Sequence, residues 1–351
     1  MRQSKQDARA TAGADPVEDL MSNVVVLRPS RRGLPAGAGA VAALIASPSR
    51  VRAAYPERPI RIIVPFAPGG PTDIMARVVA TPLGEVLGKS AIVENRAGAG
   101  GNIGIGAAAR SEPDGYTLLL TSSAYVLNPA LYEQVPYDPF KDFEPVAELG
   151  TSPNVVLVEP KLGVNTVQDL VAMSKAQPDR LNYSSPGVGT TPHLAAELLK
   201  LRTGIRMTHV PYAGAGPAIQ AIVAGTVPVA VTALPPAHPH VQSGALKALA
   251  VTGRERWFDL PNVPTLVELG YADLVSDTFQ ALLAPTGTPR DIVERLAKEA
   301  TAIVNRPEIR ERLQQAGFEV IGKGPDSLKA RIAEEVPKWK ALTAETGIKA
   351  S

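Results

Sequence analysis

The segment that most constrains the fold runs from Tyr55 to Asp73, because it joins a β-branched strand to a helix through a glycine loop. Residues 60–64 form the apolar run that a covered parallel strand needs, and Pro71 after Gly70 suits the first position of a helix. The free N–H groups and the positive dipole end of that helix face the space beyond the strand, where α/β sheets bind ligands. The sequence therefore predicts an anion site here, suited to a carboxylate or a phosphate.

The amino-acid composition restricts the kinds of partner and site that this protein can have. The 351 residues exceed one comfortable core, and a hydrophobic fraction of 45% with a formal net charge of +2 is typical of a globular protein of two domains. Basic and acidic residues are interspersed after residue 55 and only 5% of residues are aromatic, so we expect no nucleic-acid partner. The lack of cysteine excludes disulfides and thiolate sites but leaves the compartment open.

The N-terminal region carries the pattern of an export signal. Three arginines between residues 28 and 32 precede a small apolar run at 33–46, and residues 51–53 resemble a signal-peptidase site. We expect residues 1–53 to be a signal peptide with an N-terminal extension, and the mature protein to be periplasmic.

Three alternatives concerning this region stay open. The first is a disordered tail rich in alanine and glycine, because the polar segment at 47–52 is longer than usual. Translation starts at either Met1 or Met21, and export follows either the general or the twin-arginine route.

Strand and helix signals alternate after residue 54. This alternation predicts parallel β-sheet covered by helices on both sides. Thr166 and Asp169 form a capping-box pattern before a helix, and Pro307 and Gly317 should bound another. The predicted strands are residues 60–64, 91–94, 116–121, 155–158, 227–232 and 248–252.

A second glycine-rich passage, residues 182–193, repeats the first design. Thr191 is predicted as the N-cap of a helix and Pro192 as its first residue. A third passage, residues 210–217, adds an aromatic side chain and a helix start at Pro217. Each loop alone is equally well explained as a flexible entry to a helix. Their recurrence half a chain apart favours a ligand cleft between two domains.

The glycines of residues 98–104 do not form a dinucleotide site. The third glycine of the required motif falls on Ile103, and the strand that follows carries no acid at the required distance. A structural turn with close helix packing explains them better.

Two enzyme or metal alternatives are weak. His238 and His240 are predicted to lie in an irregular loop with three prolines, without a carboxylate or cysteine to complete a metal shell. A serine hydrolase built on Ser184, Ser185 and His193 lacks the usual nucleophile motif around either serine.

Together these motifs resemble the Bug family, the extracytoplasmic solute receptors of tripartite tricarboxylate transporters. The resemblance covers essentially all of residues 55–348. It rests on the passages 55–60, 65–73, 94–104, 113–116, 128–129, 136–139, 183–193, 209–212, 249–252 and 261–265.

The resemblance implies a type II periplasmic binding protein, with two α/β lobes, a hinge and an interlobe ligand cleft. Lobe I is expected to comprise residues 54–154 and 263–351, and lobe II residues 155–262. The implied function is the capture of a small carboxylate, such as a di- or tricarboxylate or an aromatic acid, by lobe closure and its delivery to cognate membrane permease subunits. We expect a monomer without cofactor, metal or catalysis; a ligand sensor for a signalling pathway is the alternative, and the identity of the acid and of the permease stays open.

The glycine loops and the resemblance together assign the ligand site. The expected ligand-binding residues are Phe66, Pro68, Gly69, Gly70, Thr72, Asp73, Thr121, Ser123, Ser184, Gly187, Gly189, Thr190, Thr191, His193 and Tyr212.

The chain departs from the family at Pro228, where many members carry an acidic residue. The strand after it is uncharged, which disfavours a zwitterionic ligand that needs a counter-charge for its ammonium group. The alternative is that Pro228 marks an edge strand.

The signal pattern leads to the first prediction. The secreted protein should begin near Ala54 or Tyr55 and accumulate in the periplasm, because cleavage follows residue 53. Intact-mass measurement of the fractionated protein tests this, and cytoplasmic protein that retains Arg28 would contradict it.

Overall fold

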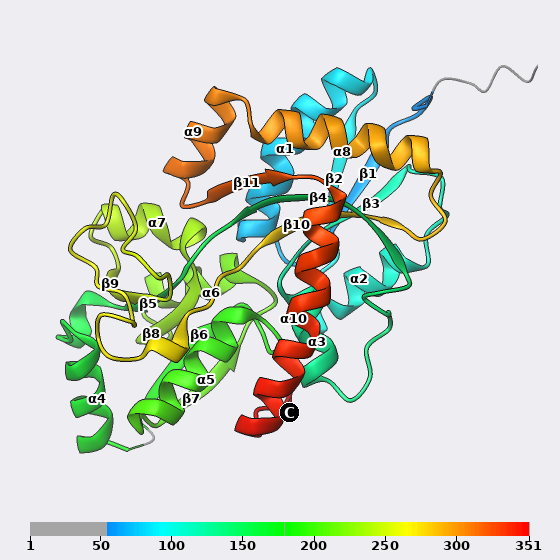
Figure 1. The fold of residues 1–351 in the computed structure, drawn as a ribbon. Coiled ribbons are helices and arrows are strands. Elements are labelled where there is room, and N and C mark those ends of the chain that lie inside the picture. Colours follow the sequence, from blue (N-terminus) through cyan, green and yellow to red (C-terminus); the bar gives the residue numbers. More distant parts are fainter. Residues whose placement is uncertain (1–54, 179, 351) are drawn as a thin grey trace, which may run out of the picture. The chain divides into compact units, whose positions relative to one another are not determined.

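The structure is a computed structural model that describes residues 55–178 and 180–350 (Figure 1). The predicted signal peptide, residues 1–53, lies outside the described residues. Within the described part of the chain, no helix combines the length and apolar character needed to cross a membrane.

The first sheet has six strands in the order β11-β4-β10-β3-β1-β2. β1 is parallel to β2 and β3, whereas β10 is antiparallel to β3 and β4, and β11 is antiparallel to β4. The predicted parallel sheet is therefore mixed, because β4 leaves this sheet for the second one and β10 returns in the opposite direction. The strands are β1 (Ile60–Val64), β2 (Ala91–Asn95), β3 (Thr117–Ser122), β4 (Phe143–Thr151), β10 (Gln280–Pro285) and β11 (Glu319–Lys323).

Helices cover both faces of this sheet. Side chains of β1 and β3 such as Ile62 and Leu120 pack with α1 and α8 on one face. Ile63 and Leu119, which alternate with them, pack with α2, α3 and α10 on the other. These helices, with the short α9, are α1 (Pro71–Leu87), α2 (Asn102–Ala109), α3 (Ala124–Leu131), α8 (Arg290–Val304), α9 (Pro307–Gln315) and α10 (Pro325–Thr346). We call this sheet and its helices lobe I.

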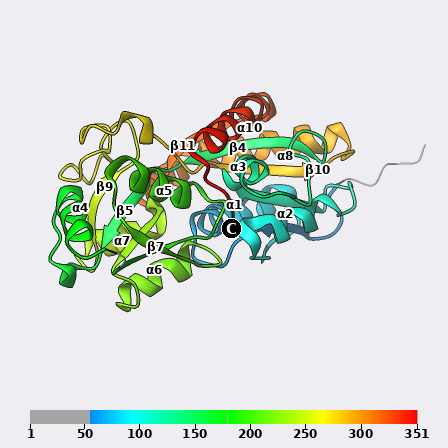
Figure 2. The ribbon, with the colours of Figure 1, turned by 90° about the horizontal axis from the view of Figure 1, so that it is seen from below.

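The second sheet has five strands in the order β7-β6-β8-β5-β9 and carries helices α4 to α7 (Figure 2). We call it, with these helices, lobe II. Its strands are β5 (Asn154–Val158), β6 (Leu181–Ser185), β7 (Met207–Pro211), β8 (Val229–Ala233) and β9 (Lys247–Val251). Its helices are α4 (Val167–Ala176), α5 (Thr191–Thr203), α6 (Ala215–Val223) and α7 (Leu234–Gln242); three short 3-10 turns lie at Ala99–Gly101, Pro160–Leu162 and Ala272–Leu274.

Two expectations about prolines are wrong. Pro228 does not mark an edge strand, because β8 lies between β6 and β5 in the middle of its sheet. The segment with His238 and His240 is not an irregular loop but the helix α7. Pro235 and Pro236 fall in its first turn, where the missing N–H groups have no intrahelical role.

Other local predictions are confirmed. The capping box of Thr166 and Asp169 is present at the start of α4. The glycines of residues 98–104 form a turn into α2, and a Cβ at Gly104 would lie only 2.7 Å from Cα of Pro65. This close packing explains the glycine without a nucleotide.

Two extended segments connect the lobes and lie side by side (Figure 1). Ser152, after β4, and Thr278, before β10, exchange both backbone hydrogen bonds, at 3.1 and 2.8 Å. This pairing holds the two crossing segments together and makes them the hinge between the sheets.

Arg331 of α10 ties lobe I to the hinge. Its guanidinium donates to both carboxylate oxygens of Asp277, at 2.7 and 2.8 Å, and to Glu148 and Glu335, each at 2.7 Å. It also lies over the ring of Phe279, 4.5 Å from the centroid. Burial alone would lower the pKa of Arg331, but the carboxylates of Asp277 and Glu335 raise it. The guanidinium is therefore always charged. It joins α10, which carries it, to Glu148 of β4 and to Asp277 of the second crossing segment.

Removal of this guanidinium should be costly. Arg331→Ala leaves the buried carboxylate of Glu148 without its cation, so we expect the free energy of unfolding in urea to fall by about 3–5 kcal/mol. Arg290→Ala removes an exposed pair with Glu294 and should change it by less than about 0.5 kcal/mol. Equal effects of the two changes would contradict the assigned role of Arg331.

Candidate functional site

A small cavity lies where the two lobes meet the hinge. Its volume is about 20 Å³, which is room for about one water molecule. Among the described residues that line it, none is charged. They are Phe66, Gly70, Pro71, Thr72 and Ser122 of lobe I, Thr278 of the hinge, and Pro186, Thr190, Thr191, Pro192, Ala215 and Ala233 of lobe II.

Five helices begin at this cavity. Gly70, Thr190 and Ala233 are the N-caps of α1, α5 and α7, Ala215 is the first residue of α6, and Ser122 lies just before α3. In the part of the chain that the structure describes, none of these five helices has a side-chain hydrogen bond at its N-cap. Their positive dipole ends therefore face the cavity. Of the five, α1 alone has an acid in its first turn, Asp73, which is not part of the lining, and the Ser122 hydroxyl accepts a hydrogen bond from Ala124 N–H of α3 at 3.4 Å.

Helices α1 and α5 also leave backbone donors at the cavity. The first intrahelical hydrogen bonds run from Ile74 N–H to the Gly70 carbonyl and from Leu194 N–H to the Thr190 carbonyl. The N–H groups of Thr72 and Thr191 precede these bonds, so they lie outside the helical ladder. This arrangement can stabilise an anion through N–H groups and dipoles alone.

Asp73 supports the first loop from within the protein. Its carboxylate accepts hydrogen bonds from Gly69 N–H at 3.0 Å, Arg77 Nε at 2.9 Å and Asn95 Nδ2 at 2.9 Å. Burial alone would raise the pKa of Asp73, but the hydrogen bonds from Arg77, Gly69 and Asn95 lower it. Its predicted ligand role is thus accompanied by a clear structural role, since the ionised carboxylate fixes the shape of the glycine loop.

The predicted site residues fall into three groups. Five line the cavity: Phe66, Gly70, Thr72, Thr190 and Thr191. Others lie in or beside the loops where the lobes touch: Pro68, Gly69, Gly187, Gly189 and Tyr212. The remaining ones lie behind the cavity lining: Asp73, Thr121, Ser123, Ser184 and His193.

Two hydroxyls of the third group already have partners within the protein. Ser123 Oγ accepts from Phe279 N–H at 2.9 Å, and Ser184 Oγ donates to the Ala218 carbonyl at 3.2 Å. Thr121 Oγ1 is buried without a partner among the described residues.

The two lobes touch through backbone groups of their loops and through one tyrosine hydroxyl. Ala67 N–H donates to the Ala213 carbonyl at 3.0 Å, and the Tyr132 hydroxyl donates to the Val188 carbonyl at 2.9 Å. A Cβ at Gly216 would lie 2.3 Å from the Pro68 carbonyl oxygen. The lobes are therefore closed on each other, with glycine at the point where no side chain fits.

Two helix starts differ from the predictions. The N-cap of α5 is Thr190, and Thr191 is the first helical residue. Helix α6 begins at Ala215 after Gly214, two residues before the predicted Pro217. In both cases proline occupies a later position of the first turn, which tolerates it equally well.

A stack of three rings, buried at Tyr183 and His193 and half-buried at His209, lies behind the second loop. His209 stacks on His193 and on Tyr183, with centroid distances of 4.5 and 4.8 Å, and its Nε2 is 2.6 Å from Ser185 Oγ. Burial lowers the pKa of His193, and burial with the nearby His193 lowers the pKa of His209 to about 4. The serine–histidine contact is thus Ser185–His209, not the pair considered for a hydrolase. Ser185 is fully buried.

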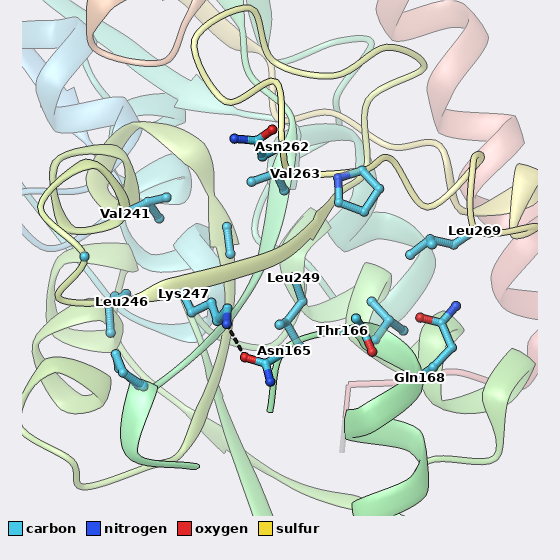
Figure 3. A pocket seen from close by; sticks show the side chains of 15 residues that line it. Asn165, Thr166, Gln168, Val241, Leu246, Lys247, Leu249, Asn262, Val263 and Leu269 are labelled. Carbon is cyan, nitrogen blue, oxygen red and sulfur yellow. Dashed lines mark hydrogen bonds between the residues drawn. The ribbon is translucent and has the colours of Figure 1, made fainter. Parts of the chain in front are cut away.

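A larger cavity, of about 580 Å³, lies within lobe II between the start of α4 and β9 (Figure 3). Lys247 donates a hydrogen bond to Asn165 at its edge. The helix that begins here is capped, because Thr166 Oγ1 accepts from Asp169 N–H and the Asp169 carboxylate accepts from Thr166 N–H, both at 3.0 Å. These donors are occupied, so the interlobe cavity is the better candidate for an anion site.

Sequence reasoning missed Thr278 and Ala233 in the lining. Thr278 reaches the cavity from the hinge, where its hydroxyl lies 2.5 Å from Thr191 Oγ1 and donates to Asn154 Oδ1 at 2.9 Å. The only usable signal was the pair of prolines after Ala233, which marks a helix start. Among the described residues no group of three or more histidine and acidic side chains could hold a metal ion.

Comparison with known proteins agrees with this architecture. The family model for the tripartite tricarboxylate transporter family receptor matches residues 75–348. Protein BugT of Bordetella pertussis is 39% identical over 297 residues, which cover 84% of this chain and 91% of that protein.

Two solved structures with ligands are similar throughout. An R. palustris protein with adipate is 33% identical, with a TM-score of 0.81 over 84% of this chain and 99% of that one. MatC from Rhodopseudomonas palustris with bound malate is 32% identical, with a TM-score of 0.78 over 82% of this chain and 99% of that one.

The ring stack generates a prediction about pH. In the folded protein His209 stays neutral down to about pH 4, whereas in the unfolded chain it binds a proton near pH 6.5. Between these pH values the unfolded state binds more protons than the folded state. The free energy of unfolding therefore decreases as the pH falls from 6.5 to 4. His209→Gln should weaken this dependence of the free energy of unfolding, measured by urea titration at several pH values. Identical slopes for variant and wild type would contradict the assignment.

Proposed function

The chain belongs to the tripartite tricarboxylate transporter family of receptors, and from this premise we propose that it binds a small carboxylic acid in the interlobe cavity. The bound acid is then delivered to the membrane permease subunits of a transporter. The observation that carries the proposal is the uncharged cavity at which five helices begin without side-chain caps. A carboxylate supplies the acceptor atoms and negative charge that these helix starts favour.

The class of ligand follows from the lining and the relatives. Adipate and malate, which two relatives bind, are both small aliphatic acids. The cavity lining offers no carboxylate, among the described residues, that could pair with an ammonium group. The uncharged β8, whose last residue Ala233 lines the cavity, supports the same preference for an acid over a zwitterion.

We assign direct ligand contacts to Phe66, Gly70, Thr72, Thr190 and Thr191, because they line the cavity. The loops with Pro68, Gly69, Gly187, Gly189 and Tyr212 close around the ligand. Asp73, Thr121, Ser123, Ser184 and His193 support these loops from behind. The Ser185–His209 pair lies outside the lining, which favours a binding role without catalysis.

Ligand entry requires the lobes to part. A cavity of about 20 Å³ admits no carboxylic acid, and the loops around it touch through their backbones. Rotation about the crossing segments at Ser152 and Thr278 would open the cavity between the expected lobe I, residues 54–154 and 263–351, and lobe II, residues 155–262. The stretch from 263 to the hinge would move with lobe II, because Thr265 and Leu266 pair with Val251 of β9. A ligand that contacts both lobes favours the closed form, because only closure brings both sets of N–H groups to it.

The proposed location is the periplasm. The arginines and apolar run before residue 53 support export, and a receptor that feeds a membrane transporter from outside must reach that compartment.

Calorimetry with adipate and malate, and with glutamate as the zwitterionic comparison, tests the ligand class. We expect at least one of the two acids to bind and glutamate to bind more weakly. A ligand at 100 times its dissociation constant should add about 2.7 kcal/mol to the free energy of unfolding. A saturating ligand should also reduce the radius of gyration in small-angle scattering.

Gly216→Ala tests closure within the same experiment. Helix propensity favours alanine here, but its Cβ would meet the Pro68 carbonyl oxygen in the closed form, so we expect a stable protein that binds the acid at least about tenfold more weakly. Gly324→Ala, also at the start of a helix but with open space around its Cβ, is the matched control and should bind normally. Unchanged affinity and compaction in Gly216→Ala would contradict ligand binding by lobe closure.

A further inference from the structure

Gln280, the first residue of β10, carries an amide without a partner. The side chain is fully buried, and neither Nε2 nor Oε1 makes a hydrogen bond to the described residues. A primary amide offers two donors and an acceptor, and such groups are almost always satisfied inside proteins. A buried amide without hydrogen bonds therefore calls for a structural or functional explanation.

The strand register places this amide below the interlobe cavity. Gln280 pairs with Ser122 on β3, and residues paired across a sheet project from the same face. Thr278 lies two residues earlier on that face, and both Ser122 and Thr278 line the cavity. The next residues on this face, Leu282 and Ala284, belong to the apolar core under α1. Gln280 is thus the polar residue between the cavity and that core.

The neighbour on the other side leaves room for the amide. Gln280 also pairs with Gly150 of β4, which has no side chain. A Cβ at Gly150 would lie 3.2 Å from Cε of Met75, so this face is the one that α1 covers. The amide consequently lies beneath the first turns of the helix whose N–H groups face the cavity.

Resting on the function proposed above, we propose that Gln280 recognises a hydroxyl group on the bound acid, so that the receptor selects hydroxycarboxylates. A carboxylate only accepts hydrogen bonds, and the helix N–H groups of Thr72 and Thr191 already provide donors for it. Oε1 of Gln280 needs a donor and Nε2 needs an acceptor. A hydroxyl group provides both.

This arrangement rejects acids that lack the hydroxyl. An acid without it leaves the amide of Gln280 buried and unpaired in the complex, and sites built to bind a hydroxyl discriminate strongly for this reason. The selection depends on a neutral side chain, so it acts on the hydroxyl and not on the number of carboxylates.

Two ligand pairs that differ by one hydroxyl test the proposal by calorimetry: malate with succinate, and citrate with tricarballylate. For at least one pair we expect the wild-type protein to bind the hydroxy acid about tenfold or more tightly than its partner. Gln280→Leu should bring that ratio close to one, mainly by weakening the hydroxy acid. Gln314→Leu, an exposed change on α9, is the matched control and should keep the wild-type ratio.

A second readout does not depend on the ligand. Leucine fills a similar volume without unpaired polar atoms, so Gln280→Leu should melt at a higher temperature than the wild type in the absence of any acid. A folded Gln280→Leu that keeps the preference for the hydroxy acid would overturn the proposal. Equal binding of both members of each pair by the wild type would overturn it too, while leaving carboxylate binding intact. If neither these four acids nor adipate bind, the proposed function fails together with it.

Discussion

The structure depends on helix starts that are left without side-chain caps. A cavity without charged lining can stabilise a carboxylate only through fixed dipoles and N–H groups, and these must already point at it. Asp73 achieves this for α1, since its ionised carboxylate binds Gly69 N–H and Asn95 and so fixes the glycine loop from behind. The capped start of α4 has its donors occupied and shows what the cavity helices lack.

The need to present backbone N–H groups to the ligand also explains how the lobes contact each other. Loops that present N–H groups to a ligand must come close without side chains in between, and Gly216 lies where a Cβ would strike the Pro68 carbonyl oxygen. The hinge keeps these loops in register, because Ser152 and Thr278 pair between the lobes and Arg331 binds Asp277 beside them. Thr278 itself lines the cavity, so the hinge and the site share a residue.

Local patterns in the sequence predicted the glycine loops and their helices, because glycine and proline act through their own backbone angles. The strand and helix around Gly70 lie where expected, and the start of α5 differs by one residue. Thr278 and Gln280 could not be found this way. The place of Thr278 in the lining and of Gln280 beneath it depends on pairing of β10 with β3, strands more than 150 residues apart, and no local pattern encodes that register.

The most direct test of this account is a crystal structure of the protein with a carboxylic acid that it binds. We predict carboxylate oxygens within about 2.7–3.2 Å of N–H groups in the first turns of α1 and α5, with the lobes closed and no lysine or arginine in contact. A carboxylate paired with a basic side chain, or bound in the cavity beside Lys247 in lobe II, would contradict it.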